Sequence, residues 1–329
     1  MKTRLFLTSI ALLLAATAGL ATAQTAPVKL RFGHTLPAND SQHLAALEFS
    51  KRVKERTQGG VEIQVFANSQ LGNDSTLINS VRSGTIDIGA TGNPFFTGLA
   101  PRLNVLDLPY QFTDAQQLYR VLDGPTGRSL LDDLGAHQLK GLAFWEIGFR
   151  SLANNKRQVS KAEDIKGLKI RTTPVYRAFF RTLGADLIQT APGDVFIALE
   201  RGTIDGYGWP SWDLKTTGWD KHTKYRVEPG FYAVANATII NLDKWKSLTD
   251  KQRDFLTQHS RKFETEYDTR YAPKTAAYLK EQADAGVQVI EFKGKVAEDY
   301  IKTAYESAWA EFQQLDPENT PKLKALISD

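Results

Sequence analysis

The chain has 329 residues, of which 42% are apolar and 24% are charged, a mixture typical of a folded protein with room for two domains. Lysine and arginine number 41 against 37 acidic residues, and these charges are scattered along the chain, so nucleic acid is not an expected partner. Because cysteine is absent, disulfides, thiolate metal sites and a cysteine nucleophile are excluded.

The start of the chain has the pattern of an export signal. Basic residues precede an apolar run from Leu5 to Leu20, and the small residues Ala21 and Ala23 then mark a cleavage site. A membrane anchor is the alternative, but the run is shorter than the ~20 residues that span a bilayer comfortably. We therefore expect residues 1–23 to be a signal peptide, cleaved after Ala23, and the mature protein to be extracytoplasmic.

After the signal, short apolar runs alternate with stretches of helical periodicity, an order that predicts an α/β fold. A helix is expected over residues 41–56, where four apolar residues share one face: Leu44, Ala45, Phe49 and Val53. The expected strands cover residues 30–34, 61–66, 86–90, 142–149, 168–172 and 287–292.

A much longer helix is expected from about Thr249 to Ala285, because aromatic residues recur at nearly every fourth position from Phe255 to Tyr271. At about 1.5 Å per residue it would be roughly 55 Å long, enough to bridge two halves of the molecule. Pro273 lies inside it and should bend it, since proline removes a backbone donor and clashes with the preceding turn. Two ordinary helices broken at Tyr271 are the alternative.

Motifs of catalysis are largely missing from the chain. It contains no G-x-S-x-G elbow, no P-loop and no H-E-x-x-H pair, and its five histidines are far apart, so we expect no metal and no cofactor. Two arginines at strand ends, Arg150 and Arg171, and the nearby Trp209 are the residues of interest. Taken alone, each arginine is more often a solvated surface charge, and Trp209 is as often a core residue, so these patterns alone leave open an exported binding protein or a hydrolase.

Segments spread over nearly the whole mature chain resemble the solute-binding proteins of tripartite ATP-independent periplasmic (TRAP) transporters. No single segment identifies the family, and the resemblance depends on the order and spacing of all of them. The matching pieces are LRFGH at 30–34, FANSQLG at 66–72, GTID at 84–87, GFR at 148–150, IKGLKIR at 165–171 and DVFIALERGTIDG at 194–206.

The resemblance implies a two-lobed periplasmic-binding-protein fold of the α/β class, with a central ligand cleft and a long bridging helix along the back. Lobe I is then expected to comprise residues 27–147 and 236–274. Lobe II is expected to comprise residues 148–235 and 275–305, and residues 306–329 to form a C-terminal helical segment.

The resemblance also implies the residues of the ligand site. In the family, the arginine that matches Arg171 pairs with the solute carboxylate through two hydrogen bonds, a geometry that suits a guanidinium fork. The other expected ligand-binding positions are Arg150, Thr35, Asp74, Phe95, Thr173, Trp209 and their neighbour His34. Trp209 and Phe95 stand where many relatives have polar residues, which favours an aromatic acid, a keto acid or a small dicarboxylate over a heavily hydroxylated solute.

The function that the resemblance implies is capture of an organic acid in the periplasm and its delivery to a membrane permease of one small and one large subunit, driven by a sodium gradient. It implies no catalysis, and we expect a monomer. Two alternatives remain open. One is a sensor with the same cleft that docks on a receptor, and the other is a periplasmic hydrolase, for which we find no nucleophile, metal site or acid/base pair.

Overall fold

A computed structural model describes residues 27–328 apart from 113–114 and 211–212. The expected signal peptide, residues 1–23, lies outside the described residues. In the part of the chain that is described, no helix is both long enough and apolar enough to cross a membrane.

The described residues form a single sheet of nine strands, in the order β2-β1-β3-β8-β4-β7-β5-β6, with β9 paired to β8. The strands are Val28–His34 (β1), Val61–Phe66 (β2), Ile88–Gly92 (β3), Leu139–Asn154 (β4), Lys169–Arg171 (β5), Asp186–Ile188 (β6), Gly206–Pro210 (β7), Tyr225–Asn241 (β8) and Gln288–Glu291 (β9). All six expected strands are present, whereas β6, β7 and β8 were not predicted.

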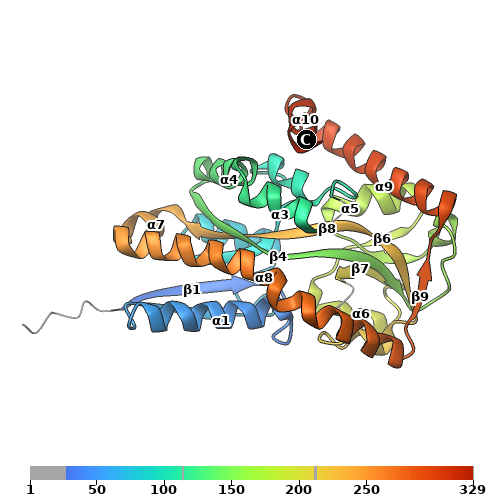
Figure 1. The fold of residues 1–329 in the computed structure, drawn as a ribbon, viewed down its shortest axis with the longest axis horizontal. Helices are drawn as coiled ribbons and strands as arrows, with labels where there is room; N and C mark the ends of the chain where they lie inside the picture. Colours follow the sequence, from blue (N-terminus) through green and yellow to red (C-terminus); the bar gives the residue numbers. More distant parts are fainter. Residues whose placement is uncertain (1–26, 113–114, 211–212, 329) are drawn as a thin grey trace, which may run out of the picture.

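The helices pack around this sheet (Figure 1). They are Ser41–Arg56 (α1), Asp74–Arg82 (α2), Ala115–Asp123 (α3), Pro125–Asp132 (α4), Pro174–Thr182 (α5), Val195–Glu200 (α6), Leu242–Ser247 (α7), Asp250–Asp284 (α8), Gly294–Leu315 (α9) and Thr320–Ser328 (α10). Short 3₁₀ turns cover Asn93–Phe96 (η1), Pro101–Asp107 (η2), Asp133–His137 (η3), Ala162–Ile165 (η4), Pro192–Asp194 (η5) and Trp219–His222 (η6).

Two parallel α/β units flank a pair of long antiparallel strands, which confirms the two-lobed α/β fold. Strands β1, β2 and β3 pair in parallel on one flank, and β5 pairs in parallel with β6 and β7 on the other. Between them β4 and β8 run from one lobe into the other (Figure 1). The expected boundaries at 147/148 and 235/236 fall inside these two strands, so the exact division between the lobes stays a prediction.

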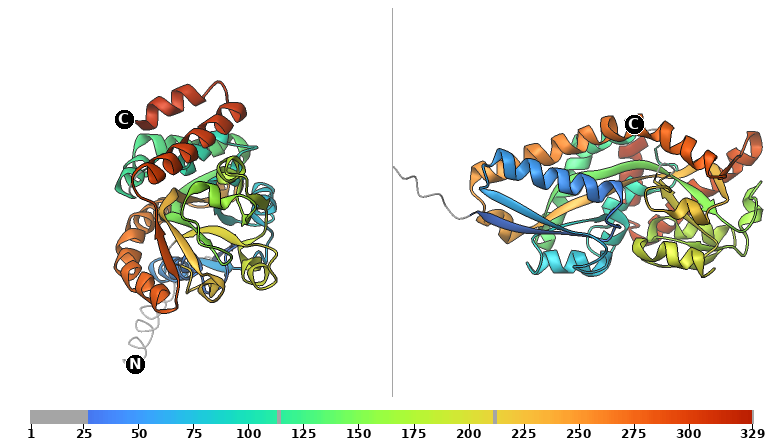
Figure 2. Two further views of the ribbon diagram at one scale, coloured as in Figure 1. Left: turned by 90° about the vertical axis from the view of Figure 1, so that its right-hand side faces the viewer. Right: turned by 90° about the horizontal axis from the view of Figure 1, so that it is seen from below.

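Helix α8 is continuous through Pro273, so one long helix is confirmed and a break at Tyr271 is wrong. It begins at a capping box in which Thr249 and Gln252 each accept a hydrogen bond from the other's backbone N–H. The helix extends past both lobes and changes direction along its length (Figures 1 and 2). It lies beside α1, to which Arg52 joins it through an ion pair with Glu266 at 2.9 Å.

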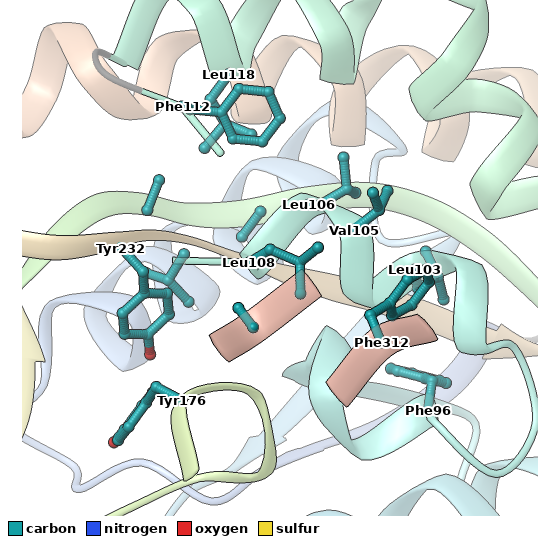
Figure 3. Packing of buried hydrophobic residues seen from close by; sticks show 14 of the residues in the cluster. Phe96, Leu103, Val105, Leu106, Leu108, Phe112, Leu118, Tyr176, Tyr232 and Phe312 are labelled. Atoms are coloured by element: carbon teal, nitrogen blue, oxygen red, sulfur yellow. The ribbon is translucent and has the colours of Figure 1, made fainter. Parts of the chain in front are cut away.

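Apolar side chains fill the space on both faces of the sheet. On the α1 face, Trp145 of β4 packs edge-on against Phe32 and Phe49 and also contacts Phe263 of α8. Of the four residues expected on the apolar face of α1, Leu44 does not face the core and is 52% exposed, because the helix is covered over only part of its circumference. The larger cluster on the other face joins elements of both lobes, and Figure 3 shows part of it around Leu108.

Candidate functional site

A cleft lies between the lobes, with about 510 Å³ of space in it when its opening to solvent is included, and we refer to it as the cavity. Seven of the eight residues singled out from the sequence line it: Thr35, Asp74, Phe95, Arg150, Arg171, Thr173 and Trp209. These residues are far apart in the chain, and the sheet brings them together because the carboxyl ends of the parallel strands in both lobes open toward the same gap.

Both lobes contribute cavity residues, which lie at the ends of strands and the starts of helices. On the lobe I side, Thr35 follows β1, Asp74 opens α2 and Phe95 lies in η1. On the lobe II side, Arg171 is the last residue of β5 and Thr173 is the N-cap of α5. The Thr173 hydroxyl is buried and has no hydrogen-bond partner among the described residues, so it is available to a polar ligand group.

Arg171 is buried, with 4% of its surface exposed. Its Nε donates to the carbonyl oxygen of Thr190 at 3.1 Å, and Nη1 lies 3.5 Å from the Tyr176 hydroxyl. These contacts fix the plane of the guanidinium group without neutralising its charge. A buried cation of this kind is stabilised by an anion, and a carboxylate matches the two-pronged geometry of arginine.

Trp209 of β7 supports both arginines. The guanidinium carbon of Arg150 lies 4.7 Å from the centre of the Trp209 ring, and that of Arg171 lies 5.7 Å from it, distances typical of cation–π contacts. The indole Nε1 donates to Asp213 Oδ2 at 3.1 Å, which fixes the ring orientation. Both positive charges therefore lie against one indole, at one end of the cavity.

Gly208, next to Trp209 in the chain, allows β7 to pack closely against Phe231 of β8. A Cβ atom at that position would come within 2.6 Å of the Phe231 ring. The Gly206-Tyr207-Gly208 sequence therefore has a packing role, since a Cβ on Gly206 would also meet the Ala153 carbonyl oxygen at 2.6 Å. Larger residues here would push β7, and with it Trp209, away from β4 and β8.

Asp74 holds the opposite, lobe I side of the cavity. Its Oδ1 accepts hydrogen bonds from Thr91 Oγ1 at 2.6 Å and Thr35 Oγ1 at 3.0 Å. Burial raises the pKa of Asp74, while these two hydroxyls and the charge of Arg171 act in the opposite direction. The carboxyl group is thus already paired within lobe I and offers its remaining oxygen to a ligand hydroxyl.

His34 is the one expected site residue that does not line the cavity. It is 2% exposed, its Nδ1 accepts from the Leu36 backbone N–H at 3.2 Å, and its Nε2 lies 2.9 Å from His43 Nδ1. Burial and the neighbouring His43 lower the pKa of His34 to about 3, so the ring is neutral at physiological pH. In this structure His34 joins the end of β1 to α1.

Several cavity residues were missed by the sequence analysis. Gln42 comes from the first turn of α1, and its Oε1 accepts a hydrogen bond from Asn236 Nδ2 at 3.1 Å. Tyr232, like Asn236, lies in β8, and its ring is 5.7 Å from the Arg150 guanidinium carbon. Tyr232 also packs beside Tyr176 at the edge of the cluster in Figure 3. Strand β8 was not predicted, so no local signal pointed to the two residues that it contributes.

Among the described residues, no group of three or more histidine or acidic side chains is placed to hold a metal ion.

The sequence is similar to a known protein family and to several of its members. The sequence profile of the DctP family, described as bacterial extracellular solute-binding protein, family 7, matches residues 32–315. An uncharacterized protein of Haemophilus influenzae is 36% identical over 286 residues, which is 85% of each chain. The 2,3-diketo-L-gulonate-binding periplasmic protein YiaO of Escherichia coli is 40% identical over 202 residues, 61% of this chain and 62% of that one.

Among solved structures, the sugar acid binding protein DctPAm of Advenella mimigardefordensis, in complex with galactonate, is similar with a TM-score of 0.85 and 27% identity. The likeness covers 92% of this chain and 98% of that one.

Proposed function

Because the chain belongs to the DctP family and is a TRAP solute-binding protein, we propose that it captures an organic acid carrying one carboxylate and several hydroxyl or keto groups. The observation that carries this proposal is the placement of two buried guanidinium groups, Arg150 and Arg171, against one indole. Two cations at one end of a cavity suit a single carboxylate better than two carboxylates held at opposite ends.

The rest of the cavity suits a hydroxylated chain or ring. Gln42 and Asn236 bring amide groups, Thr91 brings a hydroxyl, and Asp74 brings a hydrogen-bond acceptor. Trp209 and Tyr232 form an aromatic wall against which the C–H face of such a molecule packs. This mixed lining is more polar than the sequence indicated, and it favours a sugar acid over an aromatic acid or a small dicarboxylate. The diketogulonate and galactonate relatives support the same class.

We also propose where the protein works and where it delivers the solute. The signal peptide is cleaved after Ala23, the mature protein works as a monomer in the periplasm, and it passes the acid to the small and large permease subunits. It acts without catalysis, because the groups of the cavity are arranged to hold an anion. We further propose that the two lobes divide as residues 27–147 with 236–274 and residues 148–235 with 275–305.

A thermal-shift screen tests the solute class. The panel contains galactonate, 2,3-diketogulonate, glucuronate, orotate and succinate, together with galactitol, in which a neutral hydroxymethyl group replaces the galactonate carboxylate. A solute at 100 times its dissociation constant stabilises the folded protein by about 2.7 kcal/mol. We expect sugar acids to raise the melting temperature and galactitol to leave it unchanged. An equal shift with galactitol would contradict the carboxylate assignment, and a shift with succinate or orotate alone would contradict the sugar-acid class.

A further inference from the structure

Behind the cavity, the loop between β1 and α1 touches lobe II directly. Leu36 of this loop packs in the apolar cluster of lobe II that contains Tyr207 and Trp209. Asn39 Nδ2 donates to the carbonyl oxygen of Thr216, 177 residues away in the sequence. The lobes are therefore in contact at a point next to the proposed solute site, and any motion that opens the cleft there must separate these contacts.

At the same contact, two carboxyl groups face each other. Asp40 is 1% exposed and Asp213 is 2% exposed, and their side chains lie within hydrogen-bonding distance of each other. Asp40 Oδ1 accepts from the backbone N–H of Gln42 at 2.7 Å, and Asp213 Oδ2 accepts from Trp209 Nε1 at 3.1 Å. No described N–H or O–H group donates to Asp40 Oδ2.

Two ionised carboxylates cannot remain in contact in such a dry place, because their like charges repel and neither can donate a hydrogen bond. One proton between them removes the repulsion and supplies the missing donor. The pair also joins the two walls of the cavity, since Asp40 orients the first turn of α1 that carries Gln42, and Asp213 orients Trp209.

We propose that closure of the lobes on a solute takes up one proton from solution, which the Asp40–Asp213 pair then shares. The inference rests on the proposed function, because it makes the proton a second ligand of the same solute site. When the lobes part, water reaches both carboxyl groups, each ionises with the ordinary aspartate pKa of about 3.9, and the proton is released.

Other titratable and charged groups lie near the pair, and each either favours or opposes its ionisation. Arg150 of β4 favours the ionised form of Asp40, but burial and the neighbouring Asp213 outweigh it and raise the pKa of Asp40 well above its ordinary value. Burial lowers the pKa of both His34 and His43, which hydrogen-bond to each other on the lobe I side, and so favours their neutral forms. The proton is therefore assigned to the acid pair.

The sign of the pH effect follows from linkage. A carboxyl whose pKa is raised in the closed form favours that form at low pH, and the advantage is lost as the pH rises through the raised value. Between pH 5.5 and 8.5 a sugar acid remains ionised, so its own charge does not change. Solute affinity should fall by as much as about tenfold per pH unit until the pair's pKa is passed.

Titration calorimetry with galactonate, in phosphate and in Tris buffer at pH 7, counts the protons taken up. We expect about one proton per solute bound by the wild-type chain and close to none by Asp213→Asn. In that variant the new amide still accepts from Trp209 Nε1 and donates to Asp40, so folding should survive. Asp40→Asn keeps the acceptor for Gln42 N–H and is the second variant if the first is unstable.

The carboxyl ¹³C signal of Asp40 tests the same proton directly. With saturating galactonate at pH 7 it should have the chemical shift of a protonated acid in the wild type and of an ionised one in Asp213→Asn, and without solute it should be that of an ionised acid in both. Galactonate binding without proton uptake, or an ionised Asp40 in the wild type both with and without galactonate, would overturn the inference while leaving carboxylate capture intact. Failure of every acid in the panel to bind would instead contradict the proposed function.

Two further outcomes assign the effect elsewhere. Asp74 faces the cavity and its pKa is also raised, so loss of proton uptake in Asp74→Asn, with uptake retained in Asp213→Asn, would overturn the role of the acid pair. Affinity that depends on sodium or calcium at fixed pH, with no proton uptake, would mean that a metal cation occupies the place proposed for the proton.

Discussion

The guanidinium group of Arg171 is buried at the end of β5, and its Nε and Nη1 contacts are to uncharged groups, so we expect the solute carboxylate to balance its charge. Removing one member of a buried charged hydrogen-bonded pair costs about 2–5 kcal/mol, so Arg171→Ala should weaken sugar-acid binding at least ~30-fold. Arg171→Lys should recover part of the loss, because it restores the charge but not the fork. Titration calorimetry on the folded variants measures both.

Arg177 provides a matched control for that measurement. It lies on α5, outside the cavity lining, and its Nη2 donates to Gln189 Oε1 at 3.1 Å. Arg177→Ala also removes one positive charge from lobe II, and it should leave the dissociation constant nearly unchanged. Equal losses of solute affinity in the Arg177 and Arg171 variants would mean that the net charge of the lobe attracts the solute and that Arg171 makes no specific contact with it.

We expect Trp209 to act on the solute both directly and through Arg150. Trp209→Asn removes the aromatic platform, so it should alter the ranking of acids in the panel as well as lower the affinities. Trp209→Phe keeps an aromatic face but loses the bond to Asp213, and it should remove most of the change in intrinsic fluorescence that accompanies solute binding. A uniform loss of affinity for every acid would indicate that Trp209 serves only as core.

At the scale of elements, a buried carboxyl fastens the long helix to the sheet. Glu264 of α8 accepts from the Phe144 backbone N–H of β4 at 3.1 Å and pairs with Arg128 of α4 at 3.2 Å. Burial raises the pKa of Glu264 to about 7, although Arg128 and the Phe144 N–H act to lower it. One side chain therefore connects three elements of lobe I and titrates near neutral pH.

This arrangement predicts a pH-dependent stability. The folded pKa of Glu264 is raised above the unfolded value of about 4.3, so its contribution is fully present at low pH and is lost as the pH rises toward 7. Glu264→Gln cannot ionise, and its free energy of unfolding relative to the wild type should increase between pH 4.5 and 7.5, by at most roughly 3 kcal/mol. Denaturant unfolding at a series of pH values checks this, and a constant difference would show that folding does not raise the pKa of Glu264.

At the scale of the whole molecule, β4 and β8 cross between the lobes and α8 runs past both, so a relative motion of the lobes would have to bend these three elements. The ladder between β4 and β8 has register shifts between Trp145 and Gly148 and between Arg150 and Leu152, where the regular pairing is interrupted. Interruptions of this kind are natural points for bending.

We expect the lobes to close on the solute. Small-angle scattering should show a smaller radius of gyration with saturating galactonate than without it, since a ligand shifts the equilibrium toward the form it binds more tightly. Arg171→Ala at the same galactonate concentration should scatter like the solute-free protein. Unchanged scattering from the wild type, with binding verified by calorimetry, would mean that the lobes are rigid and that Pro273 has no part in a hinge.

Local patterns in the sequence were enough to predict α1 with its observed bounds and to place most of α8, because amphipathic periodicity and end caps act between residues a few positions apart. They also pointed to Arg171 at a strand end, whereas Thr173 at the following helix start came only from the family resemblance. The same local reasoning missed β8, since this central strand contains Pro229, Gly230 and several small or polar residues that usually interrupt strands.

Only the tertiary structure decided which distant residues meet. Placing β8 between β3 and β4 brings Tyr232 and Asn236 into the cavity, and Gln42 joins them from α1. The contact between Asp40 and Asp213 arises because two lobes, each folded on its own parallel strands, touch behind the solute site. From sequence alone, an aspartate is predicted to be an ordinary surface charge. It binds a proton near neutral pH only when folding removes it from water and places it against another carboxyl group.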